Sequence, residues 1–353
     1  MNNMQVPKYW KTELSDIQEI TESVSFGEKR ILGKSAGGRN IYSVFYGRKN
    51  VFDRKANLSS ALGAGMRECY ANKQTDKYTP TLLLAGGIHG AEFEGIAAVL
   101  NLISVMESGK DLAGENTELK EKLSGINLLI VPCINPDGRS RVPKSSMVGS
   151  SLKDLRKYNQ GQWKNGELCL WPECKKYHPI KEYVSFLGGY FNDSGINLMH
   201  DDFFINPSEE VKILMKLADD YVPDLTVLLH GGINGDDHIL KPAYAPAPVK
   251  EEIQKLEKRM LIRLSEEGIR YSETENDRGE NSAAAASFNL CSMLYQLCGE
   301  ACITFESNQG LSEKNAMTYE QIYRAHIILF EECRNFILGK RWKNEAQNEK
   351  MPF

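Results

Sequence analysis

Apolar runs typical of buried strands alternate along this chain with longer segments in which apolar residues recur at helical spacing. Each strand-like run is short and nearly continuous in apolar residues, which favours a strand buried on both faces. The helical segments are longer and carry polar residues on one side. The strand-like runs are residues 82–87, 126–132, 224–230 and 301–306, and the helical patterns are residues 95–109, 208–220, 248–267 and about 317–339.

Strands that alternate with helices indicate an α/β fold with a mostly parallel central sheet. Residues 29–47 add an expected hairpin, because apolar and polar residues alternate around the turn-like sequence SAGG. No linker separates two cores, so we expect residues 1–353 to form a single domain. Residues 139–207 show only weak periodicity. We interpret them as a long loop-rich insertion with a functional role.

Polar side chains follow three of the apolar strands at the points where these strands end. His89, His230 and Glu306 occupy such positions, and Glu92 lies three residues beyond His89. Because the carboxyl ends of strands in an open α/β sheet form the ligand crevice, we expect these residues to converge. Two imidazoles and one carboxylate are a common catalytic zinc set that leaves a fourth position open. The pattern therefore predicts a metal site, with Glu306 as a nearby general base.

A structural role for the same residues is the alternative. A single H-x-x-E pattern occurs by chance, and a lone histidine at a strand end is commonly a hydrogen-bonded structural residue. Polar residues at two further strand ends, His230 and Glu306, favour the metal site, because three coincidences at one sheet edge are harder to explain.

Composition narrows the partners that we expect. A net charge of −4, with 25% charged and 41% hydrophobic residues, is typical of a soluble globular protein and gives no electrostatic reason to expect nucleic acid or a membrane as partner. The N-terminus lacks the apolar segment of a secretory signal, and the eight cysteines lie in strand-like or helix-like contexts. We therefore expect a cytoplasmic protein with reduced thiols. The oligomeric state stays open.

Four motifs in a fixed order, with a strand ending in histidine, resemble the M14 zinc carboxypeptidase family. They are GKSAGGRNIYSVFYG, GGIHGAE, CINPDG and ITFES, and the similarity extends over roughly residues 25–340. The resemblance implies a mixed sheet of about eight strands flanked by helices. It also implies one zinc ion held by His89, Glu92 and His230, with Glu306 as general base.

The resemblance further implies a cation beside the metal for the oxyanion of the tetrahedral intermediate. In the family this cation is an arginine in a WRK-like segment after the NPDG motif. The segment DLRKYNQG offers Arg156 as the best match, whereas Arg139 and Arg141 lie nearer to the motif in sequence. We predict Arg156 as the catalytic cation and keep Arg139 and Arg141 as candidates for substrate binding.

One segment departs from the family. Carboxypeptidases that resemble this chain bind the terminal carboxylate with an Asn-Arg pair in a segment similar to GVDLNRNF, and the nearest match here is SGINLMHDDFF. Asn197 then takes the place of the aspartate, Met199 that of the asparagine and His200 that of the arginine. A neutral histidine beside Asp201 and Asp202 lacks the charged fork that binds a carboxylate. We predict that these three residues, His200 to Asp202, bind a cationic group or a sugar hydroxyl; a structural cluster is the alternative.

The stretch WPECKKYHP suggests a second zinc site with Cys169, Cys174 and His178 as ligands. However, the spacing lacks a C-x-x-C knuckle, and no fourth ligand is evident. We therefore interpret this stretch as a packed loop with reduced thiols.

Together these features predict a zinc-dependent hydrolase that cleaves an amide or peptide bond in a substrate other than a standard free C-terminus. The expected partner is a modified or cell-wall-derived peptide, or a small acylated amine or amino acid. One alternative is a true carboxypeptidase that binds the carboxylate with another cation. An alternative of a different class is a binding protein that keeps the zinc scaffold without turnover.

Overall fold

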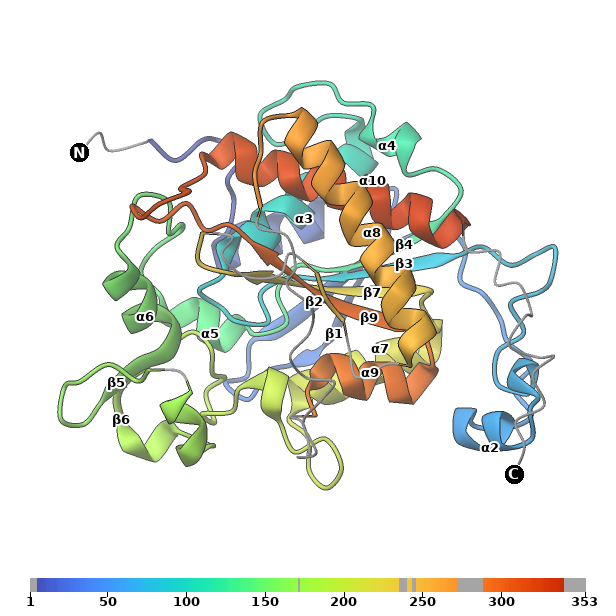
Figure 1. Cartoon of the computed structure of the whole chain (residues 1–353), viewed down its shortest axis with the longest axis horizontal. Coiled ribbons are helices and arrows are strands. Elements are labelled where there is room, and N and C mark those ends of the chain that lie inside the picture. Colours follow the sequence, from blue (N-terminus) through green and yellow to red (C-terminus); the bar gives the residue numbers. More distant parts are fainter. Residues whose placement is uncertain (1–4, 171, 235–239, 243–245, 272–287, 340–353) are drawn as a thin grey trace.

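The structure is a computed structural model that describes residues 5–170, 172–234, 240–242, 246–271 and 288–339. In this part of the chain, a twisted sheet of seven strands forms the centre of the molecule (Figure 1), in the order β1-β2-β4-β3-β7-β9-β8. The strands are β1 (Glu28–Lys34), β2 (Asn40–Tyr46), β3 (Thr81–Ala85), β4 (Asn127–Val131), β7 (Leu225–Gly231), β8 (Leu240–Pro242) and β9 (Ala301–Ser307).

The sheet is mixed, as the sequence predicts. Strands β4, β3, β7 and β9 run parallel in its middle, whereas the hairpin β1-β2 and the edge strand β8 are antiparallel to their neighbours. The α/β prediction is confirmed, and the strand count in the described residues is one lower than the expected eight. The parallel arrangement brings the carboxyl ends of the four central strands to one edge.

Alternate side chains of the central strands enter two different cores, as the pleat of a strand requires. Leu82 and Leu84 pack in one core with residues of α3 and α10. Leu83 and Ala85 pack in the other core with residues of α7 and α9. Because both faces are covered, most residues of these strands are apolar.

Helices lie on both faces of the sheet, and Figure 1 shows α3, α8 and α10 on one side and α7 and α9 on the other. The longer helices are α1 (Leu14–Ser23), α3 (Phe93–Ser108), α7 (Glu209–Tyr221), α8 (Ala247–Glu266), α9 (Leu290–Cys298) and α10 (Tyr319–Gly339). The shorter ones are α2 (Leu58–Gly63), α4 (Leu119–Lys122), α5 (Pro136–Arg141), α6 (Leu152–Gln160) and the 3-10 helices η1 (Arg67–Cys69), η2 (Glu173–Tyr177), η3 (Lys181–Tyr183) and η4 (Leu198–His200). None of the helices in the described residues combines the length and apolar character that a bilayer crossing requires.

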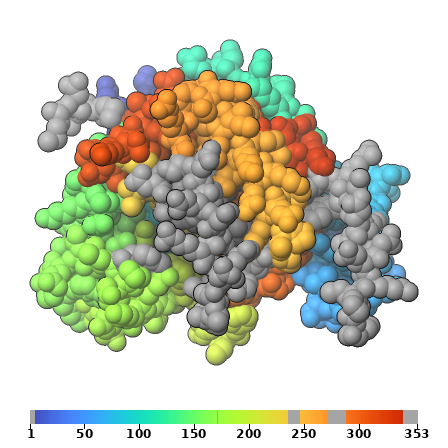
Figure 2. All heavy atoms as spheres, viewed as in Figure 1, coloured from blue at the N-terminus to red at the C-terminus, as the bar shows by residue number. Residues whose placement is uncertain are grey.

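The segment 139–207, expected to be rich in loops, contains α6, three 3-10 helices and a small antiparallel sheet of its own. This sheet pairs β5 (Gly161–Trp163) with β6 (Val184–Leu187). In the space-filling view the segment forms a continuous green surface on one side of the molecule (Figure 2). It lies at the edge of the sheet where the central strands end, because its residues line the cavity described below.

Candidate metal centre and active site

The turn after β3 carries the first two residues of the site and depends on glycines. Gly87 has a φ of +58°, a conformation that L side chains rarely adopt. Gly90 lies so close to α5 that a Cβ atom would be 2.0 Å from the backbone nitrogen of Arg139. These glycines allow the chain to leave β3 sharply and to place His89 and Glu92 before the first turn of α3.

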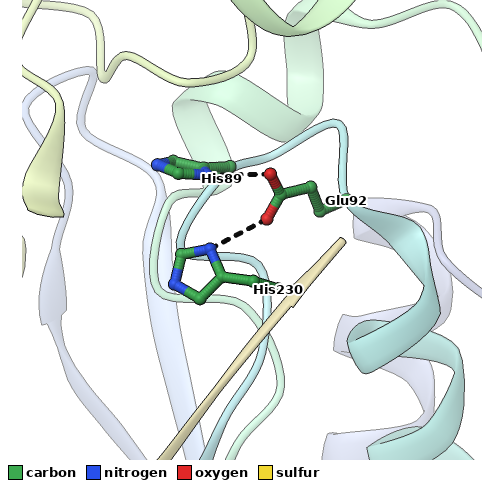
Figure 3. Close-up of side chains that lie close together, drawn as sticks. All are labelled: His89, Glu92 and His230. Atoms are coloured by element: carbon green, nitrogen blue, oxygen red, sulfur yellow. Dashed lines mark hydrogen bonds and ion pairs between the residues drawn. The ribbon is translucent and has the colours of Figure 1, made fainter. Parts of the chain in front are cut away.

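His89, Glu92 and His230 converge on one point, as predicted from their positions after β3 and in β7 (Figure 3). The Nδ1 atom of His89 lies 2.9 Å from one carboxylate oxygen of Glu92, and the Nδ1 atom of His230 lies 3.0 Å from the other. One ligand atom from each residue lies within 4.8 Å of the others, and all three side chains are buried. This donor set of two imidazole nitrogens and one carboxylate fits a zinc ion with an open fourth position.

The charge of the centre also suits a cation. Burial alone would raise the pKa of the Glu92 carboxyl group, but the two facing imidazoles outweigh burial and lower this pKa to about 2. Glu92 is therefore a buried anion, and such an anion requires a positive partner. A divalent cation between the three side chains would provide it.

Glu306 lies next to this group. It is paired in register with His230 across the parallel strands β7 and β9, and its side chain lines the same cavity. Gly232 leaves room for it, because a Cβ atom at Gly232 would be 3.2 Å from a carboxylate oxygen of Glu306. The structure therefore brings the predicted general base and the predicted ligands to a single cavity wall.

The cavity has a volume of about 490 Å³ and lies over the carboxyl ends of the central strands. The predicted catalytic cation Arg156 lines it from α6, and its side chain is exposed. Met199 and His200 line it from η4. The other wall residues are Leu152, Leu155, Asn159, Gln160, Leu170, Tyr190, Asn197, Gly231, Gly232, Ile233, Asn289, Thr304 and Gln309.

His200 is a neutral side chain in this wall. Burial, assisted by the charge of Lys175 and by nearby histidines, lowers the pKa of His200 to about 3. At neutral pH, His200 therefore offers a hydrogen-bonding imidazole and no positive charge.

Asp201 and Asp202, which we expected to bind substrate with His200, are not among the cavity-lining residues. Asp201 accepts hydrogen bonds from the backbone nitrogen and the hydroxyl group of Ser208, at 2.6 and 2.7 Å, just before α7 begins. Asp202 accepts a bond from the backbone nitrogen of Ile205 at 3.3 Å. These contacts match the structural alternative for the two carboxylates.

Arg139 and Arg141 also lie outside the lining residues. Arg139 is fully buried, forms an ion pair with Glu13 at 2.6 Å and donates to the carbonyl oxygens of Thr12 and Val142. Arg141 pairs with Asp193 and donates to backbone carbonyl groups of the segment 187–191. Because α5 turns both guanidinium groups toward protein partners, neither faces the cavity.

Comparison with known proteins bears on the N-terminal part of this site, which contains His89 and Glu92. Residues 15–177 match the family model of the zinc carboxypeptidases, Peptidase_M14. This part, a little under half of the chain, is similar to the M14 zinc carboxypeptidases. A comparison with curated proteins found no match.

Solved structures of carboxypeptidases share the fold of this M14-like chain. A metallo-carboxypeptidase from Burkholderia cenocepacia is 12% identical with a TM-score of 0.56, and the match covers 92% of this chain and 68% of that one. Bovine thrombin-activatable fibrinolysis inhibitor, solved with a tick carboxypeptidase inhibitor, is 14% identical with a TM-score of 0.54, covering 94% of this chain and 99% of that one. Carboxypeptidase A from Helicoverpa armigera is 12% identical with a TM-score of 0.51, covering 95% and 76%.

The N-terminal motif that resembles the M14 family has a clear structural use. Its Arg39 forms an ion pair at 2.8 Å with Asp137 of the NPDG motif, and Asp137 also accepts bonds from the Ser35 hydroxyl group and the Gly37 backbone nitrogen. Asp137 is fully buried. The hairpin β1-β2 therefore fixes the loop after β4, which lies beside the metal-binding turn.

Two residues of the M14-like site were missed from the sequence. Tyr190 stacks on the ring of His89, with centroids 4.0 Å apart and planes inclined by 27°. Gln309 lies against Gly231, accepts a bond from the backbone nitrogen of Ile233 at 3.2 Å, and has a buried Nε2 group without a hydrogen-bond partner in the described structure. The sequence signal for Gln309 was its position three residues after Glu306. Tyr190 had no such signal, because it lies in a stretch without periodicity.

The suspected second zinc site is not supported within the described residues. Cys169 and Cys174 are buried in a small apolar cluster, and the only metal-binding group found in the described part of the chain is that of His89, Glu92 and His230. The Nε2 atom of His178 instead accepts a hydrogen bond from the backbone nitrogen of Asn197 at 2.8 Å. The packed-loop interpretation fits these contacts.

Proposed function

We propose that the protein is a zinc-dependent hydrolase that cleaves an amide or peptide bond. The observation that carries this proposal is the position of Glu306, which lines the same cavity as the convergent group His89, Glu92 and His230. A metal-binding group and a carboxylate base in one cavity are the parts that hydrolysis by an activated water requires. The family match supports the same class of reaction.

Each residue then has a defined task. His89, Glu92 and His230 would hold the zinc ion, which when bound supplies Lewis acidity to the scissile carbonyl group. Glu306 accepts a proton from the attacking water and delivers it to the leaving nitrogen atom. Arg156 donates to the oxygen atom that becomes negatively charged during the attack. The proton that Glu306 takes up is returned in the same turnover, so the carboxylate is regenerated.

We propose further that the substrate is not a standard free C-terminus. Met199 and His200 line the cavity where the family resemblance predicts an Asn-Arg pair, and His200 is neutral at physiological pH. A thioether and a neutral imidazole lack the charged fork that binds a carboxylate. A modified peptide, or a small acylated amine or amino acid, suits this wall better.

Two alternatives compete with this assignment. A true carboxypeptidase would use Arg156, the arginine that lines the cavity in the described structure, to bind the terminal carboxylate. A non-catalytic binding protein would keep the metal-binding residues but would not turn over a substrate. The position of Glu306 in the cavity argues against the binding protein, because a binder has no need for a base beside the metal.

The test is zinc-dependent cleavage of one acetylated tripeptide offered with a free and with an amidated C-terminus, followed by a panel of acyl amino acids and acyl amines. We expect at least one of these amides to be cleaved. We also expect the tripeptide with a free C-terminus and the one with an amidated C-terminus to be cleaved at similar rates, or neither to be cleaved. Cleavage of the free form alone would establish the carboxypeptidase. The matched control is Glu306→Gln, which should bind zinc and lose turnover; zinc binding by the wild type without turnover of any member would favour the binder.

A further inference from the structure

The ring of Tyr190 forms part of the cavity wall and is held there by contacts on two sides. It stacks on the His89 ring, with centroids 4.0 Å apart and planes inclined by 27°. Its backbone nitrogen donates to the carbonyl oxygen of Asn159 at 2.8 Å, in the last turn of α6. Tyr190 is thus fixed between the turn after β3 and the helix that carries Arg156.

The hydroxyl group of Tyr190 lies near the groups that the proposed hydrolysis uses. It is within electrostatic range of the Glu92 and Glu306 carboxylates, and the Gln160 side chain forms a hydrogen bond with it. Both carboxylates line the same cavity as Tyr190. A hydroxyl group that both of them influence lies beside the place where the scissile bond must be.

One face of α6 connects this hydroxyl group with Arg156. The residues of α6 that line the cavity are spaced as i, i+3, i+4, i+7 and i+8, which is one side of a helix: Leu152, Leu155, Arg156, Asn159 and Gln160. Arg156 and Gln160 are four positions apart, so their side chains are neighbours on this face. Because Gln160 contacts the Tyr190 hydroxyl group, the phenol and the guanidinium group approach the cavity from the same side.

A phenol in this position is a neutral hydrogen-bond donor. The usual pKa of a tyrosine is about 10, so the hydroxyl group keeps its hydrogen at pH 7. Its oxygen atom can accept a bond from the Gln160 amide while its hydrogen is donated elsewhere. Such a donor binds the oxygen of a neutral carbonyl group weakly. It binds the oxyanion of a tetrahedral intermediate more strongly, because that bond is charge-assisted.

We propose that Tyr190 is a second donor to the oxyanion and acts together with Arg156. The inference rests on the hydrolysis of the proposed function. During the attack the carbonyl oxygen gains negative charge, and the Tyr190 hydroxyl group and the Arg156 guanidinium group donate to that one oxygen atom. No covalent bond to Tyr190 forms or breaks, and its hydrogen stays on the phenol. The segment 139–207 then supplies two donors, one charged and one neutral, that are used mainly in the transition state.

The first experiment uses methylphosphonate, a tetrahedral anion, as a probe of the full chain loaded with Zn²⁺. Calorimetry compares its dissociation constant in the wild type and in Tyr190→Phe, which keeps the stacked ring and removes only the hydroxyl group. We expect the variant to bind the anion about 10-fold more weakly, since a hydrogen bond to a charged group is lost, with zinc content unchanged. The control is Tyr158→Phe, also on α6 but outside the cavity wall, which should bind the anion as the wild type does.

Turnover of an amide from the substrate panel gives the second readout. Tyr190→Phe should lower kcat by about 100-fold with little change in KM, because the donor acts in the transition state. The double variant with Arg156→Met should lose less than the product of the two single losses, because both donors serve one oxygen atom. The acid limb of the pH profile of kcat/KM should stay in place. A shift of this limb with an unchanged plateau would mean that Tyr190 supports Glu306 instead, and would overturn the inference.

Equal methylphosphonate affinities for the wild type and Tyr190→Phe would overturn this inference and leave the proposed hydrolysis standing. A wild type that binds zinc and methylphosphonate but cleaves none of the amides would overturn the proposed function, whereas weaker anion binding by Tyr190→Phe would still establish the donor. A wild-type protein that binds no zinc would overturn both. Because the binding measurement needs no substrate, an unidentified substrate does not affect its outcome.

Discussion

His230 of β7 is the direct neighbour of Glu306 of β9, paired with it in the register of two parallel strands. This pairing places the His230 imidazole and the Glu306 carboxylate side by side at the edge where both strands end. Gly231 and Gly232 follow His230. A Cβ atom at either position would collide with the side chain that packs against that glycine. The two glycines therefore keep this part of the wall open.

The contact between Gly232 and Glu306 gives the first prediction. A Cβ atom at Gly232 would lie 2.8 Å from the Cβ atom of Glu306, so Gly232→Ala must displace the carboxylate. Misplacement of a reacting group by about 1 Å can cost about 100-fold in rate, so we expect a fall in kcat of that order with zinc content unchanged. The control is Gly63→Ala in α2, where no atom lies within 4 Å of an added Cβ. Equal kcat values for the two variants would contradict this role of Gly232.

Removal of the metal gives the second prediction. On the proposed assignment zinc binds His89, Glu92 and His230 only in the folded protein, so saturating zinc should raise the free energy of unfolding, by about 4 kcal/mol at 1,000 times the dissociation constant. Glu92→Gln should abolish this zinc-dependent gain, measured by urea unfolding with and without a chelator. Glu94→Gln is the matched control, because burial and the nearby Glu92 raise the pKa of Glu94 to about 8 and leave it mostly uncharged at pH 7. Loss of the gain in both variants would count against the assigned ligands.

The sequence predicts the part of the site that strand ends determine. His89, His230 and Glu306 follow apolar runs that were recognisable as parallel strands, and such strands must end at a common edge. Glu92 followed from its spacing to His89. The motifs that resemble the M14 family point to the same four residues. Their convergence could be predicted from the strands alone, without predicting the loops.

The structure differs from the sequence-based expectation for side chains whose direction depends on tertiary contacts. Arg139 was placed near the cavity because it follows the NPDG motif, but α5 turns it toward Glu13 of the N-terminal segment. Asp201 was predicted to bind substrate, but its carboxylate accepts a hydrogen bond from the backbone nitrogen of Ser208, just before α7. Tyr190 reaches His89 through a fold of the segment 139–207 that leaves no periodic signal in the sequence.

Acid should destabilise the protein through His326, which lies in α10 far along the chain from the metal-binding residues. Burial lowers the pKa of His326 from 6.5 to about 4. Between these two values the unfolded chain binds a proton that the folded protein does not, so stability falls as pH decreases, by up to about 1.4 kcal/mol per pH unit from this group. Above pH 6.5 this loss is absent.

The variant His326→Asn isolates this contribution. Asparagine can donate to the Ile322 carbonyl oxygen, as the Nδ1 atom of His326 does at 2.8 Å, but it does not titrate. We expect the difference in unfolding free energy between the two proteins to shift in favour of the variant as the pH is lowered from 7 to about 5. A difference that stays constant over this range would show that His326 does not titrate on unfolding.

Arg156 gives the last prediction, because its two candidate tasks have opposite kinetic signatures. Its side chain lines the cavity and no hydrogen bond or ion pair joins it to another residue within the described structure. As the donor to the developing oxyanion, it acts in the transition state, so Arg156→Met should lower kcat by about 100- to 1,000-fold with little change in KM.

Arg156→Lys should recover part of this loss, since lysine keeps the charge without the fork. As a reader of a terminal carboxylate, Arg156 would instead raise KM when replaced, and only for substrates with a free C-terminus. The control is Lys153→Met on the same helix, an exposed cation outside the cavity wall. Equal kinetics for the methionine variants at both positions would remove Arg156 from either role.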